Sequence, residues 1–336
     1  KKEKISSENN VNALTINDNS IVFEDGLTIE EKLKFKEKGK KIYRIKDYFE
    51  ENCKIISQEK NFRKDIFLIA DDKKLEIKEK VEKVGKPLKA WNVKIYFGIK
   101  TGYNEAFIID TETRNRILAN CKNEEERKRT EEIIKPILRG RDIERYRYKW
   151  AGLWVICTFP SKKIDIEQYP ALKEYLARFG ERLLQDGKPG HRKKTPHKWY
   201  ETQDNIAYYP EFEKEKIVWQ EIVREPSFAY DNTGIYVEAT GFLMTGKNLK
   251  YLLGLLNSNP VAFFFKTFYA GGGLGEDGYR YKKAFLEQLP LPPITPQTQP
   301  LADQIVQKVD HILSLTQSPD YETNKEKQQK VKELEK

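Results

Sequence analysis

The sequence is poor in cysteine and histidine, and it has no long apolar run. The 336 residues include three cysteines, Cys53, Cys121 and Cys157, whose spacing fits neither a disulfide framework nor a zinc site. Three histidines further limit any metal site. Because no run of about 18 apolar residues occurs, we expect no transmembrane helix. "KKEKISSENN" is not followed by the apolar segment of a signal peptide, so a reducing cytoplasm is predicted.

Known catalytic motifs are missing as well. An adenine methyltransferase needs Asn or Asp followed by Pro-Pro and an aromatic residue, which together grip the amino group being methylated, and no such tetrapeptide occurs. The chain also lacks a glycine-rich cofactor loop, a P-loop and a zinc-protease motif. No active site is therefore visible. Since the chain begins without Met, we expect a segment of a longer polypeptide.

Positive charge is concentrated in one part of the chain. The net charge is +9, and residues 135–200 contain 16 Lys and Arg against 7 Asp and Glu, so this region accounts for the whole excess. Such a patch is the electrostatic footprint of a protein that binds a polyanion, nucleic acid above all. The alternative is a solvated basic face without a partner.

Short helices and strands alternate without a regular order. Thr28 and Glu31 form a capping box that predicts a helix over about 29–38. Residues 66–77 are predicted as two strands about a turn, and 91–110 as two strands joined by a glycine-bearing loop. Further predicted elements are helices at 112–135, 166–184, 248–258 and 301–315, strands at 152–160, 216–222, 227–231 and 234–240, and an exposed loop at 185–200. Without a regular βαβ rhythm the fold class is α+β.

A metal-dependent nuclease is one alternative function. Such enzymes often combine an Asp with a later acid two positions before a Lys, and "DDK" at 71–73 and "EIK" at 76–78 contain these pairs. In a sequence this rich in Lys and Glu such pairs are expected by chance. His191 and His197 have no cysteine or carboxylate at ligand spacing, so we interpret them as polar loop residues.

Several motifs in order resemble one family, the TaqI-like C-terminal specificity domain of type IIG restriction–modification enzymes and adenine-specific DNA methyltransferases. They span about residues 65–293 and read "GKPLKAWNVKIYFGIKTGYNEAFIID", "IKPILRGRDIERY", "YPALKEYL", "KWYE", "KIVWQEI", "YLLGLLNS" and "LEQLPLPP". The tail "LPLPPITPQTQPLADQIVQKVDHIL" also resembles the end of a target recognition domain in type I specificity subunits, where a spacer helix follows.

The resemblance implies a mixed-sheet target recognition domain at 61–293, followed by a long C-terminal helix and tail at 294–336. Residues 1–60 would connect it to an upstream methyltransferase domain in the same polypeptide. That domain would bind S-adenosylmethionine and methylate a flipped adenine, and an endonuclease domain, with Mg²⁺, can accompany it. The expected partner is double-stranded DNA, with no membrane partner and an undefined oligomeric state. A separate specificity subunit that works in trans through the helix at 301–315 is another alternative.

The "LRGRD" turn supplies the first candidate DNA contacts. Ile134, Ile137 and Leu138 are expected to anchor it on the core, while Arg139, Arg141 and Arg145 face DNA. Arginine can clamp phosphate or hydrogen-bond a guanine edge with two donors. In the alternative interpretation, Arg139 and Arg141 tie the turn through nearby acids.

Three other segments supply the remaining candidates. Backbone amides and short polar groups of the loop between the strands at 91–110 could hold phosphate, the loop at 185–200 is strongly basic, and the "GGGLGEDGYRYKK" segment combines a glycine run with cations. Trp154, Trp219, Phe263, Phe264 and Phe265 are predicted in the core. The candidates are Lys100, Thr101 and Asn104; Lys188, Arg192, Lys193, Lys194, Lys198 and Trp199; and Arg280, Lys282 and Lys283.

Overall fold

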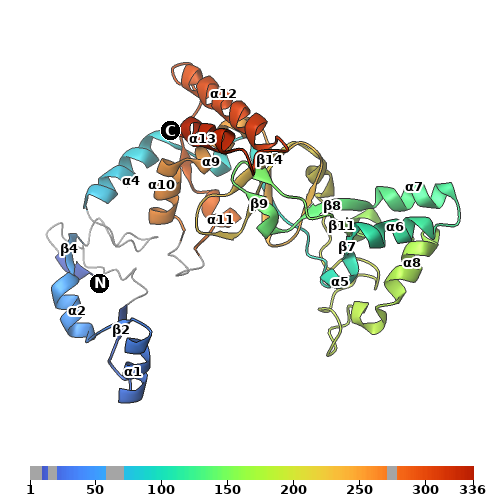
Figure 1. Cartoon of the computed structure of the whole chain (residues 1–336), viewed down its shortest axis with the longest axis horizontal. Coiled ribbons are helices and arrows are strands. Elements are labelled where there is room, and N and C mark those ends of the chain that lie inside the picture. The colour runs from blue at the N-terminus through green and yellow to red at the C-terminus, as the bar shows by residue number, and fades with distance from the viewer. Residues whose placement is uncertain (1–9, 14–20, 58–71, 271–277) are drawn as a thin grey trace, which may run out of the picture. The chain divides into compact units, whose positions relative to one another are not determined.

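The computed structural model describes residues 10–13, 21–57, 72–270 and 278–336, and the chain divides into two compact units (Figure 1). One unit comprises residues 1–85 with 271–278, and the other comprises 86–270 with 279–336. Helices and several small sheets occur together, which confirms the predicted α+β class. Among the described residues, no helix has both the length and the apolar character needed to cross a bilayer.

The first unit is built from short elements. Its elements are β1 (Asn10–Ala13), β2 (Ile21–Phe23), α1 (Ile29–Glu37), β3 (Lys41–Tyr43), α2 (Ile45–Asn52), β4 (Lys54–Ser57) and α4 (Asp72–Val84). β1 pairs antiparallel with β4, and β2 pairs parallel with β3. The capping box is confirmed, because the Thr28 hydroxyl accepts from the Glu31 amide and the Glu31 carboxylate accepts from the Thr28 amide.

Helix α4 overturns part of the strand prediction for residues 66–77. Residues 66–71 lie outside the described part of the chain, but 72–77 are helical. Lys and Glu are strong helix formers, and pairs such as Lys78 with Glu82 at i,i+4 support the helix. The helix ends at Val84, directly before Gly85.

The second unit contains two four-stranded sheets; β14 of one is labelled near the middle of Figure 1, and β7, β8 and β11 of the other are labelled to its right. One sheet is antiparallel with the order β14-β12-β16-β6, and the other is mixed with the order β15-β8-β11-β7, in which β15 runs parallel to β8. The strands of this unit are β5 (Lys86–Pro87), β6 (Val93–Phe97), β7 (Ile108–Asp110), β8 (Ile134–Leu138), β9 (Ile143–Glu144), β10 (Arg147–Tyr148), β11 (Leu153–Ile156), β12 (Lys216–Gln220), β13 (Ile222–Val223), β14 (Phe228–Asp231), β15 (Tyr236–Val237), β16 (Gly241–Gly246), β17 (Tyr279–Arg280) and β18 (Pro290–Leu291).

The two sheets meet where β6 ends. The Gly98 amide donates to the carbonyl of Gly241, the first residue of β16, and the next amide, of Ile99, donates to the Val237 carbonyl of β15, at 2.9 and 2.7 Å. The chain therefore passes from one sheet to the other within two residues. Glycine is required here, because a Cβ on Gly98 would lie 2.0 Å from the carbonyl oxygen of Glu238.

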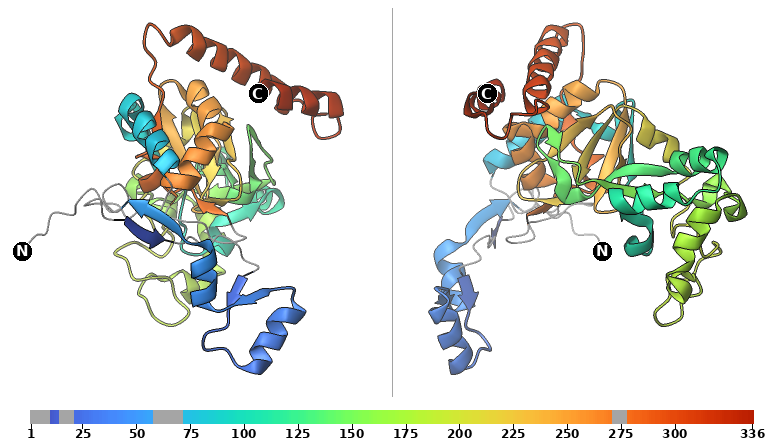
Figure 2. Two further views of the ribbon diagram at one scale, coloured as in Figure 1. Left: turned by 90° about the vertical axis from the view of Figure 1, so that its left-hand side faces the viewer. Right: turned by 45° about the vertical axis from the view of Figure 1, so that its right-hand side comes forward.

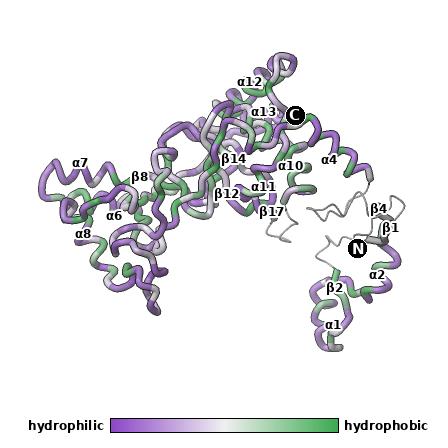
Figure 3. Tube along the Cα trace, turned by 180° about the vertical axis from the view of Figure 1, so that it is seen from behind, coloured by the Kyte–Doolittle hydropathy of each residue, from purple (hydrophilic) through white to green (hydrophobic). Residues whose placement is uncertain are grey.

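Helices surround these sheets. They are α5 (Asn104–Phe107), α6 (Thr111–Ala119), α7 (Glu124–Glu132), α8 (Pro170–Ala177), α9 (Leu249–Asn257), α10 (Asn259–Phe268), α11 (Lys283–Leu286), α12 (Gln299–Thr316) and α13 (Lys325–Leu334), with 3-10 turns at Leu88–Ala90, Gly140–Asp142, Pro160–Lys162, Ile166–Gln168, Gly180–Leu183 and Tyr209–Glu213. α12 packs on α9, and α13 packs on α12 (Figure 2). Figure 3 shows α7 as hydrophilic along its length, in contrast to the apolar strands.

Three of the five aromatic residues predicted in the core are buried. Trp219, Phe264 and Phe265 are buried, and the Trp219 ring stacks on Phe242 at 5.5 Å. The prediction was wrong for Phe263, which is 51% exposed, because it lies on the side of α10 that faces away from Phe264 and Phe265. Trp154 is only half-buried, and the Arg114 guanidinium lies over its ring at 4.2 Å.

Candidate nucleic-acid interface

An open pocket of about 540 Å³ lies where the two sheets meet. The turn after β8, the end of β12, the segment between β15 and β16 and the start of α5 all contribute to its wall. Three residues predicted as DNA contacts, Asn104, Arg139 and Arg141, are thus brought together. The lining residues are Asn104, Glu105, Ile108, Arg139, Arg141, Leu153, Gln220, Glu238 and Thr240.

Glu238 organises one wall of the pocket. Its carboxylate accepts from Asn104 Nδ2 at 3.0 Å and from Thr240 Oγ1 at 2.7 Å. The same Thr240 oxygen accepts from the Gly140 amide at 2.9 Å, which links this wall to the "LRGRD" turn. Two of these bonds connect residues 134 and 100 positions apart, so they fix the pocket through tertiary structure.

Arg139 supports the turn in the way that the alternative interpretation predicted. Its Nε and Nη2 atoms donate to the two carboxylate oxygens of Asp142 at 2.9 and 2.7 Å, and its backbone amide also donates to that carboxylate. The hydrogen bond to Asp142 raises the pKa of the Arg139 guanidinium. Arg139 therefore closes the 3-10 turn Gly140–Asp142, and its remaining donors face the pocket.

Arg141 differs from Arg139 in that its guanidinium has no partner among the described residues. It is exposed, and neither a hydrogen bond nor an ion pair holds it to the described part of the chain. The second half of the alternative interpretation, that Arg141 also ties the turn, is therefore wrong. Arg141 remains available for a ligand.

Two residues that the sequence predicted as DNA contacts, Arg192 and Thr101, are buried. Their side chains are therefore not exposed for a direct contact with DNA. The Arg192 side chain is 3% exposed, and its guanidinium donates to the carbonyls of Leu183, Thr101, Glu201 and Trp199 at 2.6 to 3.1 Å. Burial lowers the pKa of this guanidinium to about 10. Arg192 thus joins the loop after β6 to the loop at 185–200.

Thr101 is also buried, with an exposure of 0%. Its hydroxyl donates to Asn104 Oδ1 at 2.6 Å and accepts from the Tyr103 amide at 3.1 Å, so it shapes the loop and does not reach a phosphate. Lys100, next to it, is exposed and its ammonium has no partner in the described part of the chain. Asn104 is exposed at the pocket, although both ends of its amide are hydrogen-bonded.

The loop at 185–200 exposes the other predicted lysines. Lys193 and Lys194 are exposed and have no ion pair with the described residues. Lys188 lies 3.3 Å from Asp186, and Lys198 lies over the Tyr200 ring at 5.5 Å. Trp199 is half-buried and packs edge-on against Tyr200. The exposed-loop prediction holds for these lysines, while Gln185, Arg192 and Tyr200 turn inward.

The last group of candidates, Arg280, Lys282 and Lys283, does not line the pocket. β17 pairs with β13, which directly follows Gln220 and Glu221, and Lys282 lies 3.7 Å from Glu221. Arg280 is half-buried and Lys283 pairs with Glu287 at 3.7 Å. The glycine run that precedes them, residues 271–277, lies outside the described residues.

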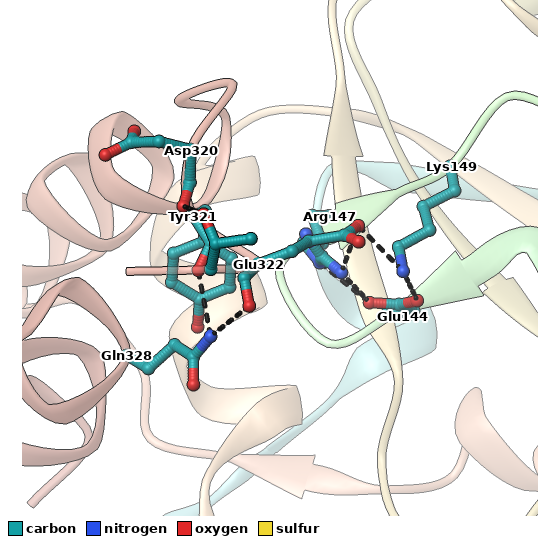
Figure 4. A network of polar contacts seen from close by, with 8 residues as sticks. Glu144, Arg147, Lys149, Asp320, Tyr321, Glu322 and Gln328 are labelled. Atoms are coloured by element: carbon teal, nitrogen blue, oxygen red, sulfur yellow. Dashed lines mark hydrogen bonds and ion pairs between the residues drawn. The ribbon is translucent and has the colours of Figure 1, made fainter. Parts of the chain in front are cut away.

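The C-terminal segment covers the second half of the basic stretch. Arg145 pairs at 2.5 Å with Glu335, which directly follows α13. Arg147 and Lys149 pair with Glu322 at 3.0 and 2.7 Å (Figure 4). Ile134, Ile137 and Leu138 are buried as predicted. Arg145 was predicted to face DNA, but its guanidinium is paired with Glu335 and is therefore not free for a phosphate.

Gln220 and Glu238 were not predicted from the sequence. Gln220 ends the apolar strand "KIVWQ", and the only local signal is a polar residue at the point where that strand leaves the core. No group of three or more potential metal ligands occurs among the described residues. The acidic pairs proposed for a nuclease fall partly outside the described part, since Asp71 is not described, while Asp72 and Lys73 belong to α4.

Comparison with known proteins places the pocket within a recognised module. Residues 135–291 match the TaqI-like C-terminal specificity domain. This match confirms the resemblance noted in the sequence, and it includes six of the nine lining residues, from Arg139 to Thr240. No curated protein matches the chain.

Two solved structures share part of the chain trace. One is the type IIL restriction-modification enzyme MmeI in complex with DNA, at 14% identity and a TM-score of 0.47, with 74% of this chain and 32% of that chain covered. The other is the type IIG restriction endonuclease BpuSI, at 14% identity and a TM-score of 0.41, with 77% and 32% covered. The chain thus spans about a third of the length of either enzyme.

Proposed function

We propose that this chain reads a sequence in double-stranded DNA, as the target recognition domain of an adenine-N6 DNA methyltransferase or type IIG restriction–modification enzyme. The observation that carries the proposal is the Arg141 guanidinium, which has no partner among the described residues and lies at an open pocket, within the segment that matches a specificity domain. A guanidinium presents paired donors to the acceptors of a guanine edge in the major groove.

The flanking loops supply affinity without sequence preference. Lys100, Lys193 and Lys194 are exposed and unpaired among the described residues, and Arg192 holds their two loops together through the Thr101 carbonyl. Cations that neutralise phosphates release counterions, so their contribution falls steeply with salt. In this proposal the lysines position the duplex and the pocket reads base edges.

Catalysis belongs to another domain in this proposal. An upstream methyltransferase domain in the same polypeptide would bind S-adenosylmethionine and flip the target adenine while this chain holds the duplex. Mg²⁺ would be needed where an endonuclease domain is present. The alternative is a separate specificity subunit that meets its catalytic partner through α12, and the reading frame that encodes the chain distinguishes the two arrangements.

The test is selection from a pool of random-core duplexes by the full natural polypeptide, with binding measured at 50 and 200 mM salt. An enriched motif supports sequence reading. A steep salt dependence with no enriched motif would mean that the protein binds only phosphates, with a nonspecific dissociation constant of about 10⁻⁴ to 10⁻⁶ M. That result would overturn the proposal. Arg141→Ala should weaken discrimination at one base pair, and Lys193→Gln should weaken binding to all sequences equally.

A further inference from the structure

One polar side chain of the pocket has no assigned role. Gln220 is the last residue of β12, an inner strand of the antiparallel sheet, and its half-buried side chain forms part of the pocket wall. Its carboxamide makes no hydrogen bond with any described residue. A carboxamide carries both donors and an acceptor, so leaving it without a partner in protein is unusual unless solvent or a ligand binds it.

The other polar side chains of the lining are already engaged. Arg139 is bound to Asp142, Glu105 accepts from Tyr103, and Asn104, Glu238 and Thr240 bind one another. Arg141 and Gln220 are therefore the two polar side chains of this pocket that lack a partner among the described residues. The engaged groups form a fixed frame, and the two unpaired groups face the open space within it.

The backbone brings Gln220 against the turn that carries Arg141. A Cβ on Gly140 would lie 3.0 Å from Gln220 Cγ and 2.8 Å from the Thr240 carbonyl, so only glycine allows this approach. The Gly140 amide is bound to Thr240, and the adjacent Glu221 amide donates to the Thr240 carbonyl at 3.1 Å. Both side chains thus emerge from backbone that is held rigidly, as sequence reading requires.

We propose that Gln220 is a specificity-determining residue that, together with Arg141, reads base edges in the major groove. This inference rests on the proposed function. Glutamine donates to and accepts from the N7 and N6 positions of adenine, as arginine donates to O6 and N7 of guanine. The recognised sequence then contains an adenine contacted by Gln220 close to a guanine contacted by Arg141.

The experiment is duplex selection with the full natural polypeptide and its Gln220→Ala and Gln220→Glu variants, followed by affinity measurement on single-base variants of the selected site. Gln220→Ala should reduce discrimination at one adenine position by roughly 5- to 150-fold, the range of one bidentate contact, with an unchanged salt slope. Gln220→Glu should move the preference at that position toward cytosine, because a carboxylate accepts from cytosine N4.

Gln307→Glu is the matched control. Gln307 is exposed on α12, outside the pocket, and the change adds the same charge. A motif that Gln220→Ala leaves unchanged at every position would overturn this inference while the proposed function stands. A wild-type protein that enriches no motif would overturn the proposed function itself, and the inference with it.

Discussion

The Glu322 carboxylate lies 3.0 Å from the Arg147 guanidinium, although 175 residues separate them in the chain. Glu322 is in the segment between α12 and α13, and Arg147 is on β10. Lys149 approaches the same carboxylate at 2.7 Å, and Tyr321 lies beneath Arg147 at 5.1 Å (Figure 4). The C-terminal segment thus supplies acids to three cations of the basic stretch, Arg145, Arg147 and Lys149.

Removing these acids should therefore strengthen DNA binding. In the Glu322→Gln/Glu335→Gln variant, Arg145 loses its C-terminal acid, while Arg147 and Lys149 lose one of two acids and share only Glu144, so positive charge becomes available to phosphate. The expected result is higher affinity and a steeper dependence of log K on log salt, by about 0.9 for each new phosphate contact. Binding titrations between 50 and 200 mM salt measure both quantities.

Glu326→Gln provides the control for this variant. Glu326 is exposed in the first turn of α13 and is not among the acids that pair with Arg145, Arg147 and Lys149. It removes the same type of charge without freeing any of the three cations. If both variants gain the same affinity per charge removed, net charge alone is responsible. The ion pairs that Glu322 and Glu335 make with the three cations then have no separate effect on DNA binding.

Substitution of Arg192 should affect protein stability, whereas substitution of its neighbour Lys193 should affect DNA binding. Arg192→Ala removes the only donor that the described residues offer to the Leu183 and Trp199 carbonyls, and one of two donors to the Thr101 and Glu201 carbonyls, so the protein should lose roughly 3 kcal/mol of unfolding free energy. Lys193→Gln should leave unfolding unchanged and lower the salt slope by about 1. Urea unfolding combined with salt titration separates the two effects. Equal stability of both variants would contradict a structural role for Arg192.

This contrast marks the limit of the sequence prediction for the site. Residues 192–194 read as three consecutive cations in a polar loop, and nothing local distinguishes the one that turns inward. The partners of Arg192 include the Thr101 carbonyl, 91 residues away. Gln220 was missed for the same reason, because its importance depends on its approach to Gly140.

Local signals predicted much more of the fold. The Thr28 capping box and the buried anchors Ile134 and Ile137 depend on neighbouring residues, and the structure has them as predicted. The helix α9 follows from its leucine spacing. The failure at residues 72–77 is also local, since alternating apolar positions suggested strand while the Lys and Glu content favoured helix.

The buried pair Lys216–Asp231 should make the protein sensitive to acid. Both side chains are fully buried, and Tyr148 and Thr233 also donate to Asp231. Burial alone would raise the pKa of Asp231, but Lys216 and these hydrogen bonds outweigh it and hold the pKa below its ordinary value. A carboxylate with a lowered folded-state pKa stabilises the fold above its unfolded pKa of about 4 and loses that contribution as pH falls.

The Asp231→Asn variant tests this dependence. It leaves Lys216 buried without its counterion, so it should lose about 3–5 kcal/mol at pH 7 and show a smaller further loss between pH 5 and pH 3 than the wild type. Urea unfolding at pH 7, 5 and 3 measures both, with the exposed Asp303→Asn as control. Parallel pH profiles for wild type and Asp231→Asn would show that this pair does not set the acid response.

Gly140→Ala should separate sequence reading from DNA affinity. The new methyl group would meet the Thr240 carbonyl at 2.8 Å and Gln220 Cγ at 3.0 Å, so the turn must move and carry Arg141 with it. Overpacking of this kind costs about 1–3 kcal/mol of stability. The lysines at 100, 193 and 194 do not depend on this turn, so the salt slope should be retained while discrimination between bases falls.

Thr240 provides a matched pair for the same test. Thr240→Val removes the hydroxyl that accepts from the Gly140 amide, whereas Thr240→Ser keeps it. Valine should therefore reproduce part of the loss of discrimination seen in Gly140→Ala, and serine should leave the selected motif intact. If Gly140→Ala binds the wild-type motif with undiminished preference, the position of the turn cannot be what aims Arg141 and Gln220 at the bases.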